Sequence, residues 1–481
     1  MKKILSSLRF VLLASVFLTS AVTTRADDGI RTAVGGIEYE IRYTGEGYDA
    51  KSLYAILCYE TNDNVITRLD AIPEAVTGKY EFYNNGELCS CYLTAFVTTI
   101  GKFAFNNSPV LSSVTIPEFI TVIYSDDDSF YPGHGAFEGC TAITELNWKA
   151  RNCPTKGRMP SDNIERVTIG SEVTILPDGF VKDSKITEVT IPNSVTTIGS
   201  GAFNNCSGLV NVNIPDAVTT IGNYAFEGCS GLTSIDIPNS VDTIGFRAFK
   251  DCSGLTSVNI SNSITTISEL AFYNCSKLTN VIIPNSVTTI DNYAFTYCYG
   301  LSSITIPNSV RTIGAGAFSG CSSLTNVSIP NSVNSISTMT FYLCTNLASV
   351  IIPYSVTSIA AGAFYGCNKL TEITCYATIP PTVGTNAFIN YNATLRVPRE
   401  SVELYRTTSP WSNFCNIVEV GGNQTGDVNE DGEVTISDVN FLLDFILSGT
   451  EYLESADLNN DGEIGISDVN ALIEYLLSGG W

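Results

Sequence analysis

Residues Ile191–Cys206 read I-P-N-S-V-T-T-I-G-S-G-A-F-N-N-C, and this string returns with small changes every 23 residues. A phenylalanine stands three residues before the end of each copy, and a cysteine ends each copy, at Cys206, Cys229, Cys252, Cys275, Cys298, Cys321, Cys344 and Cys367. A fixed period of this length indicates a stack of equivalent units, each of which needs its neighbours to bury its apolar side. The sequence therefore predicts a solenoid, an architecture that commonly serves as a binding surface.

One copy of the repeat, Leu209–Cys229, shows the elements that each unit should contain. Apolar and polar residues alternate from Leu209 to Ile214, which predicts a short half-buried strand; Pro215 ends it because proline lacks the N–H for the next ladder bond. The stretch from Val218 to Ile221 predicts a second extended pair, and the spacing within Ala225 to Cys229 predicts one inward-facing helical turn. The expected fold is an α/β repeat solenoid with 23-residue units.

The eight periodic cysteines are expected to be buried thiols rather than disulfides. Equivalent residues in stacked strands lie about 4.8 Å apart with parallel side chains, whereas a disulfide needs converging Cβ atoms about 3.8 Å apart. A small apolar side chain with a weak S–H donor suits such a column, facing backbone carbonyls of the turn. Of the 15 cysteines, seven lie outside the column, and the sequence does not pair them: Cys58, Cys89, Cys91, Cys140, Cys153, Cys375 and Cys415.

The ends of the chain differ from the repeats. Residues 1–26 predict a secretory signal, with Lys2, Lys3 and Arg9 before an apolar run, Phe10 to Val22, that is too short to span a bilayer. The mature chain is therefore expected outside the cell, soluble or held to a surface by a partner. The remaining parts are expected to be a divergent N-terminal cap at 27–96, repeats at 97–377, a C-terminal cap at 378–420, a linker at 421–425 and a small domain at 426–481.

The repeat string of Ile191–Cys206 resembles that of the cell-surface leucine-rich repeat proteins of the BspA-like, or treponemal, type. The resemblance covers roughly Val97 to Val420, and the segment from Leu395 to Val420 looks like the C-terminal cap of that family. It implies a curved leucine-rich repeat solenoid that serves in adhesion or protein binding. It names no ligand.

The acidic C-terminal part carries a second periodic pattern. Residues 421–481 contain 13 of the 48 acidic residues and no Lys or Arg, so this part needs a cationic partner. Oxygen-bearing residues stand at positions 1, 3, 5, 7, 9 and 12 of a twelve-residue loop, in Asp427, Asn429, Asp431, Glu433, Thr435 and Asp438. Thirty residues later the spacing returns, with glycine at position 9, in Asp457, Asn459, Asp461, Glu463 and Asp468. Such spacing is typical of calcium loops and predicts two bound Ca2+ ions.

Each loop is followed by an apolar pattern that predicts a helix, at Ser437–Ser448 and at Ser467–Ser478. No helix precedes either loop in the pattern, which differs in this from an ordinary EF-hand. Two such loop–helix units with Asp at position 12 resemble the type I dockerin over Gly426–Gly479. The resemblance implies a small all-α calcium-binding domain that docks onto a cohesin of a scaffold protein. It places the partner-binding residues at loop positions 10 and 11, here Ile436, Ser437, Ile466 and Ser467.

The side chains available for catalysis disfavour an enzyme. The only histidine, His134, lies beside a loop-like insertion, where a solvated side chain is the ordinary outcome. A Cys–His pair with Cys58, Cys89 or Cys91 is a formal alternative, and carboxylates for glycoside cleavage would find no deep pocket in a stack of equal units. The net charge of −23 also disfavours nucleic acid as a ligand.

Two surfaces of the solenoid remain open as ligand sites. The outward strand positions are small and polar, in columns such as Asn211, Ser234 and Ser257, and a merely solvated face explains them equally well. The other surface is an edge of tyrosines that either bind a partner or pack on one another: Tyr273, Tyr297, Tyr299, Tyr342 and Tyr365.

These observations lead us to expect a secreted, non-catalytic adhesion or protein-recognition solenoid. A calcium-dependent dockerin would tether it to a cohesin-bearing scaffold or surface. The alternative is a carbohydrate-binding or carbohydrate-active component of a polysaccharide-degrading complex.

Overall fold

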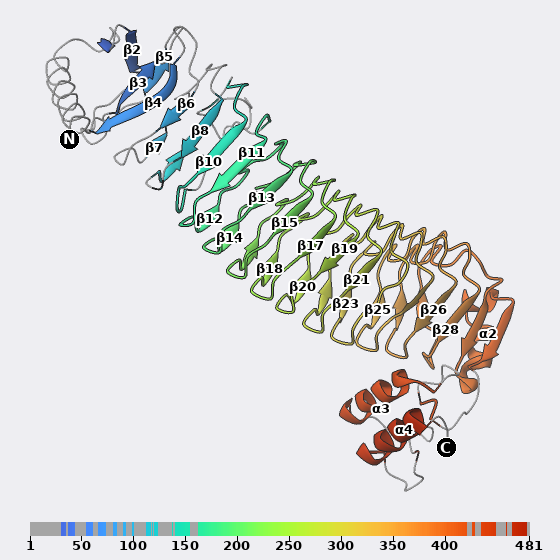
Figure 1. The fold of residues 1–481 in the computed structure, drawn as a ribbon. Helices are drawn as coiled ribbons and strands as arrows, with labels where there is room; N and C mark the ends of the chain where they lie inside the picture. The colour runs from blue at the N-terminus through green and yellow to red at the C-terminus, as the bar shows by residue number, and fades with distance from the viewer. Residues whose placement is uncertain are drawn as a thin grey trace. The chain divides into compact units, whose positions relative to one another are not determined.

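A computed structural model shows how the chain is arranged (Figure 1). It describes residues 140–153 and 162–420 without interruption, most of 112–123, Phe137, and 426–428, 434–448, 458 and 464–478 of the C-terminal module. Before residue 101 it describes the backbone of seven strands. The chain divides into two compact units, Met1–Leu301 and Ser302–Trp481.

The first unit begins with antiparallel strands. The central strand β2 (Ile37–Tyr43) pairs with β1 (Ile30–Val34) on one side and with β5 (Tyr80–Tyr83) on the other. The neighbouring strands β3 (Tyr54–Glu60) and β4 (Ile66–Pro73) form a hairpin. This part of the chain lacks the 23-residue pattern, and its topology differs from that of the repeats accordingly.

Parallel stacking starts at β6 (Ser90–Tyr92). The ladder then runs through β8 (Ser113–Ile116), β10 (Glu145–Trp148) and β11 (Arg166–Ile169), while β7 (Thr99–Ile100) pairs with β9 (Val122–Ile123). Parallel pairing therefore reaches a few residues nearer the N-terminus than the repeat boundary expected at residue 97. That boundary stays a prediction.

Each regular coil of the first unit contributes two short strands. The first strands are β13 (Glu188–Thr190), β15 (Asn211–Asn213), β17 (Ser234–Asp236), β19 (Ser257–Asn259) and β21 (Asn280–Ile282). The second strands are β12 (Ile175–Leu176), β14 (Thr197–Ile198), β16 (Thr220–Ile221), β18 (Thr243–Ile244), β20 (Thr266–Ile267) and β22 (Thr289–Ile290). Pairing is parallel and in register with the repeat, with Val189 opposite Val212, so a column of the sequence becomes a column in space.

The third side of each coil, from Gly222 to Cys229 in one repeat, is a run of tight turns instead of the predicted helical turn. Alternate N–H groups bond within the coil, as that of Glu227 does to the carbonyl of Tyr224 at 3.0 Å. The N–H groups of Tyr224, Phe226 and Gly228 instead donate to carbonyls of the next coil, each at 2.8 Å. Tyr224 and Gly228 have φ of 58° and 76°. Their left-handed conformation turns these N–H groups toward the next coil, whereas a helix would keep its bonds inside one coil.

Two columns of identical side chains fill the core of the first unit. Neighbouring phenyl rings stack with centroids 5.2–5.4 Å apart and planes within 9° of parallel, through Phe203, Phe226, Phe249, Phe272 and Phe295. The thiols form the second column, and those of Cys229, Cys252, Cys275 and Cys298 lie against a phenylalanine carbonyl of the preceding coil; the Sγ of Cys252 lies 3.1 Å from the Phe226 oxygen. Because every coil offers the same neighbours, one packing arrangement serves them all.

The second unit contains coils of the same kind. Its first strands form one parallel sheet, in the order β24 (Asn326–Ser328), β26 (Ser349–Ile352), β28 (Glu372–Cys375), β30 (Thr394–Val397) and β31 (Asn416–Glu419). Its second strands are β23 (Thr312–Ile313), β25 (Ser335–Ile336), β27 (Ser358–Ile359) and β29 (Thr382–Val383). The phenyl column is present again, with centroids 5.2–5.6 Å apart, through Phe318, Phe341, Phe364 and Phe388.

Aromatic residues cover the last coil. The chain turns through η1 (Arg399–Ser401), α2 (Val402–Thr407) and η2 (Trp411–Asn413) before entering β31. The ring of Trp411 lies 5.5 Å from that of Phe388, and its Nε1 donates to the Pro381 carbonyl at 2.8 Å. These contacts bury the end of the phenyl column under a different motif, as capping requires. The bounds of the cap expected at 378–420 stay a prediction.

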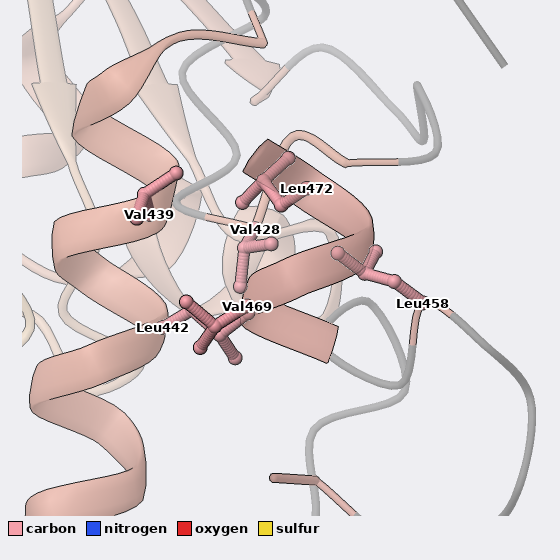
Figure 2. Close-up of a cluster of buried hydrophobic side chains, with 6 residues drawn as sticks. All are labelled: Val428, Val439, Leu442, Leu458, Val469 and Leu472. Carbon is pink, nitrogen blue, oxygen red and sulfur yellow. The ribbon is translucent and has the colours of Figure 1, made fainter. Parts of the chain in front are cut away.

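The C-terminal module consists of two similar helices, α3 (Ile436–Ser448) and α4 (Ile466–Ser478). Both predicted helices are thus confirmed, each starting one residue earlier than expected. Their contact is apolar, and Figure 2 shows its buried side chains, Val428, Val439, Leu442, Leu458, Val469 and Leu472. No helix among the described residues is long and apolar enough to cross a membrane.

Candidate functional site

The C-terminal module buries three carboxylates. The exposed fraction is 3% for Asp427 and zero for Asp438 and Asp468. Asp438 and Asp468 are the third residues of their helices, so their charges lie where the helix dipole favours an anion. The apolar cluster between α3 and α4 holds the two helices side by side and thereby fixes these positions.

The two position-12 aspartates close their loops in the same way. An Oδ2 of Asp438 accepts the N–H of Thr435 at 2.7 Å, and that of Asp468 accepts the N–H of Gly465 at 2.9 Å. The other oxygen of Asp468 accepts the N–H of Leu458 at 2.8 Å, from the start of its loop. Each carboxylate therefore ties the beginning of a helix to its loop.

The module suits a cation. Burying a carboxylate without a counter-charge is costly, and residues 421–481 contain no Lys or Arg to supply one. Oxygen ligands on a glycine-hinged loop are the donors that calcium prefers. Asp427, Thr435, Asp438 and Asp468 would be its ligands among the residues that the structure describes.

The remaining predicted ligands fall on residues that the structure leaves undescribed. These are Asn429, Asp431 and Glu433 of the first loop and Asp457, Asn459, Asp461 and Glu463 of the second. Within the described part of the chain, no group of three His, Cys, Asp or Glu side chains is placed to hold a metal. The complete ligand set stays a prediction.

The predicted partner-binding residues are on the surface of the module. Ile436 and Ile466 are 65% and 67% exposed, and Ser437 and Ser467 are exposed beside them. These four residues form two equivalent pairs at the starts of α3 and α4. Their role in binding a partner stays a prediction.

The sequence reasoning missed a second exposed pair on the same helices. Leu447 and Leu477, near the helix ends, are each 83% exposed. The helical pattern suggested that they belong to the apolar face, because the two helices match at these positions. The available signal in the sequence was their duplication at equivalent positions of the two helices.

The strand face of the solenoid is polar, as the sequence indicates. In β13, β15, β17, β19 and β21 the residues flanking the buried central position are exposed, as Asn211 and Asn213 are around Val212. Ile282 is the exception in the first unit, with 69% of its surface exposed among polar neighbours. A single exposed aliphatic residue needs no ligand to explain it.

The predicted tyrosine edge is partly packed on itself. Tyr297 contacts Tyr273 at 5.4 Å and Tyr299 at 5.7 Å between ring centroids, and Tyr342 stacks on Tyr365 at 5.2 Å. Tyr299 is nevertheless 45% exposed. Local packing of these rings is therefore observed, and the binding of a partner at this edge stays a prediction.

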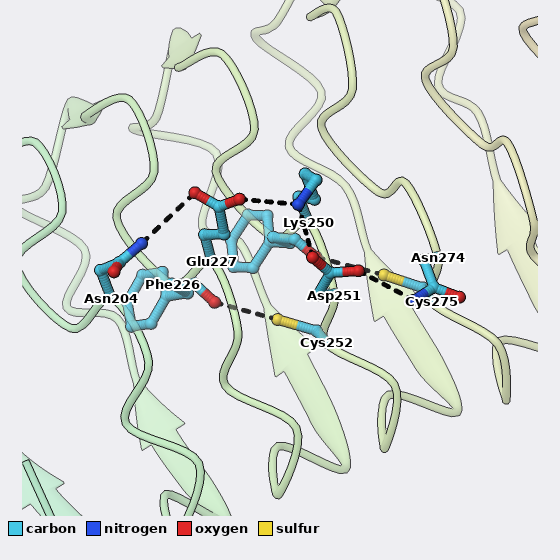
Figure 3. Close-up of polar contacts among 9 residues, drawn as sticks. Asn204, Phe226, Glu227, Lys250, Asp251, Cys252, Asn274 and Cys275 are labelled. Carbon is cyan, nitrogen blue, oxygen red and sulfur yellow. Dashed lines mark hydrogen bonds and ion pairs between the residues drawn. The ribbon is translucent and has the colours of Figure 1, made fainter. Parts of the chain in front are cut away.

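A polar network links neighbouring coils on the third side (Figure 3). Lys250 bonds to Glu227 at 2.8 Å and to Asp251 at 2.5 Å. Asn204 extends the network to Glu227 at 3.3 Å, and Asn274 extends it to Asp251 at 2.8 Å. Burial opposes the charge of Lys250, but the two carboxylates outweigh it and raise its pKa. The network satisfies its own charges across four coils, which is a structural rather than a catalytic arrangement.

The candidate catalytic side chains belong to parts of the chain that the structure leaves undescribed. His134, and the side chains of Cys58, Cys89 and Cys91, lie outside the described residues. The Cys–His pair therefore stays a formal alternative, as in the sequence analysis.

Comparison with known families assigns both parts of the chain. The profile of the BspA type leucine rich repeat region matches in six copies, over residues 71–144, 173–302 and 289–403. The profile of the dockerin type I domain matches residues 425–477. A search of the curated proteins gives no significant match.

Several solved structures are similar. A leucine-rich repeat protein from Bacteroides ovatus is 25% identical, with 74% of this chain and 95% of that chain covered and a TM-score of 0.49. A leucine rich cell surface protein from Faecalibacterium prausnitzii is 24% identical, with coverages of 73% and 95% and a TM-score of 0.35. A leucine rich repeat protein from T. pallidum is 27% identical, with coverages of 40% and 78% and a TM-score of 0.29.

The repeat profile covers well over half of the 481 residues and agrees with the stacked coils of both units. The helical module coincides with the second profile. The chain therefore belongs to the BspA type leucine rich repeat family and carries a C-terminal dockerin type I domain.

Proposed function

We propose that this protein is a secreted or cell-surface recognition solenoid that its dockerin tethers to a cohesin-bearing scaffold. The observation that carries the tether is the pair of equivalent exposed sites, Ile436 with Ser437 and Ile466 with Ser467, beside carboxylates that are fully buried in a module without cations. Two Ca2+ ions would neutralise the loops and hold these sites in place.

The solenoid itself recognises rather than converts its ligand. Its regular coils present shallow strand faces and satisfied charges, such as the network around Lys250. The repeat and dockerin families are typically non-catalytic and extracellular or cell-surface, which favours a binding role in the same setting. The ligand class that we propose is protein, and a glycan array on the full chain distinguishes this from the carbohydrate alternative.

Binding of the full chain to a panel of purified cohesin modules tests the tether. We expect calcium-dependent binding to at least one module, abolished by a chelator and by Asp438→Ala combined with Asp468→Ala. Asn440→Ala combined with Asn470→Ala is the matched control, because these exposed residues occupy equivalent helix positions, and it should bind normally. Calcium-independent binding would contradict the proposal.

The partner-binding residues need a separate test. Ile436→Ser combined with Ile466→Ser should leave calcium binding unchanged and weaken cohesin binding at least tenfold. Each single substitution should weaken cohesin binding less than the double substitution does, because the second, equivalent site is still intact. Undiminished cohesin binding by the double variant would show that the interface lies elsewhere on the module.

Hydrolysis assays test the non-catalytic assignment. Glycoside, peptide and ester substrates should show background rates with the full chain. A rate that disappears in His134→Ala would overturn the assignment and favour an enzyme.

A further inference from the structure

One column on the third side of the solenoid has left-handed backbone in every regular coil. The residue before each buried alanine–phenylalanine pair has φ near +60°, and several coils place glycine there, such as Gly201, Gly316 and Gly362. Four successive coils of the first unit instead carry Tyr224, Arg247, Leu270 and Tyr293, with φ of 57–59°. We call these four residues the left-handed ridge.

The fold needs the backbone conformation here, but it does not need these side chains. The N–H of Gly201 reaches the next coil, at the Asn223 carbonyl, over 2.7 Å; that of Tyr224 makes the equivalent bond at 2.8 Å. Glycine adopts this conformation without strain, whereas a side chain with a Cβ is penalised in it. A bulky residue in this region is an outlier that calls for a reason beyond local geometry.

Burial does not supply the reason. Tyr293 is 41% exposed, and Tyr224, Arg247 and Leu270 are only half-buried. Four neighbouring coils therefore accept backbone strain to keep large side chains at the surface. Left-handed backbone at large, partly exposed side chains is typical of functional surfaces.

The ridge carries an arginine held in a fixed position. The Arg247 guanidinium lies over the Phe246 ring at 4.7 Å and over the Tyr224 ring at 5.8 Å, and these two rings contact each other edge-to-face at 5.4 Å. Arg247 forms no ion pair with any carboxylate that the structure describes, and its buried Nε has no acceptor. On a chain with a net charge of −23, this is an oriented cation without a carboxylate partner among the described residues.

We propose that the left-handed ridge is the docking site for a folded protein partner that presents a carboxylate to Arg247 and apolar side chains to its neighbours. Tyrosine and arginine are the residue types that dominate protein–protein contacts. A glycan is disfavoured at Arg247, because its guanidinium already lies over the rings of Tyr224 and Phe246, and the next ridge residue, Leu270, offers no ring. The inference rests on the proposed role of the solenoid in protein recognition and names its site.

Glycine substitution separates this role from a structural one. In the full chain, Tyr224→Gly, Arg247→Gly, Leu270→Gly and Tyr293→Gly are combined. Because the backbone here is left-handed, the melting temperature should hold or rise while binding is lost. The matched control combines Asn205→Gly with Asn274→Gly, which share the same conformation in the column before the cysteines.

The probe is a displayed library of small helical domains with randomised faces, selected on the wild-type full chain with calcium present. We expect most selected domains to lose at least tenfold in affinity for the four-glycine variant and none for the control. Arg247→Gln should weaken the domains whose selected faces contain Asp or Glu. Selected domains that bind all variants equally would overturn the proposal, as would a marked fall in the melting temperature of the four-glycine variant.

A glycan array on the same proteins provides the second arm. Glycan binding that the four-glycine variant loses would replace the protein partner with a carbohydrate and refute the proposal. Cohesin binding by the four-glycine variant should be normal. Failure of the proposed cohesin binding and failure of the proposed binding at the left-handed ridge are therefore distinguishable.

Discussion

The thiol column predicts a steep loss of stability in alkali. Burial raises the pKa of the thiol from 9.0 to about 11 in Cys206 and to about 12 in Cys298 and Cys367. Burial also raises the pKa values of Cys229, Cys252, Cys275 and Cys344. Above pH 9 the unfolded chain releases these protons while the folded chain keeps them. The free energy of unfolding therefore falls between pH 9 and about 12, and it is unaffected by these groups below that range.

The size of the effect follows from the number of thiols. At pH 10, one unit above the ordinary pKa of 9.0, ionisation favours the unfolded chain by about 1.4 kcal/mol per thiol. Seven thiols with raised pKa together give about 10 kcal/mol. A whole domain is stable by about 5–15 kcal/mol, so the solenoid should unfold near pH 10 in mild denaturant.

Urea unfolding followed by circular dichroism between pH 7 and 10.5, in a reducing buffer, measures this loss. Combining Cys229→Ser, Cys252→Ser and Cys275→Ser removes three titrating groups. It should cost about 1 kcal/mol per site at neutral pH and reduce the alkaline loss at pH 10 to about 6 kcal/mol. The same midpoint at pH 8 and pH 10, or equal losses in the variant and the wild type, would refute the reasoning.

Three further perturbations probe the core, the turns and the module. Phe249→Ala should cost about 4 kcal/mol in urea unfolding, because its ring is fully buried between neighbours at 5.3 and 5.4 Å; a loss below about 1 kcal/mol would contradict the stacked column. Gly228→Ala should cost more than about 1 kcal/mol, since its φ is 76° and a Cβ there would lie 2.3 Å from the Asn205 Oδ1; unchanged thermal stability would show that the turn can relax. A chelator should remove the helical signal of the module while the melting of the solenoid stays the same, and Asp438→Ala with Asp468→Ala should reproduce this in calorimetry; retention of two bound calcium ions by that variant would disprove the loop assignment.

The stacking of the coils could be predicted from the sequence because the 23-residue period sets which residues of neighbouring coils pair. Val189 pairs with Val212 since they are 23 residues apart, and Cys229 approaches the Phe203 carbonyl of the preceding coil for the same reason. Proline after most of the regular first strands also marks their end, as Pro215 follows Ile214. No tertiary information beyond the repeat was needed for these features.

The third side could not be predicted in the same way. The spacing of Ala225, Phe226 and Cys229 fits an inward helical turn, and the residues are indeed buried. Whether their N–H groups bond within the coil or to the next one depends on an acceptor that only stacking provides. That choice sets the left-handed conformation at Tyr224, which is a tertiary effect invisible to local periodicity.

The sequence predicted both helices of the module. The burial of its position-12 aspartates follows from their role in closing the loops. The exposed leucines, Leu447 and Leu477, were missed because an apolar residue in helical register is ordinarily assigned to the core. A short two-helix domain cannot bury every apolar position, and the ones it leaves out are informative.

Variation among the coils is most informative where the backbone restricts it. On the strand face, either Asn or Ser is compatible with the fold. Differences such as that between Asn211 and Ser234 therefore say little about function. In the left-handed column, glycine satisfies the backbone, and every departure from it opposes folding. Four consecutive departures with large side chains at the surface are therefore stronger grounds for a contact surface than the more numerous polar residues of the sheet. The same reasoning makes glycine, rather than alanine, the substitution that separates recognition from stability in this solenoid.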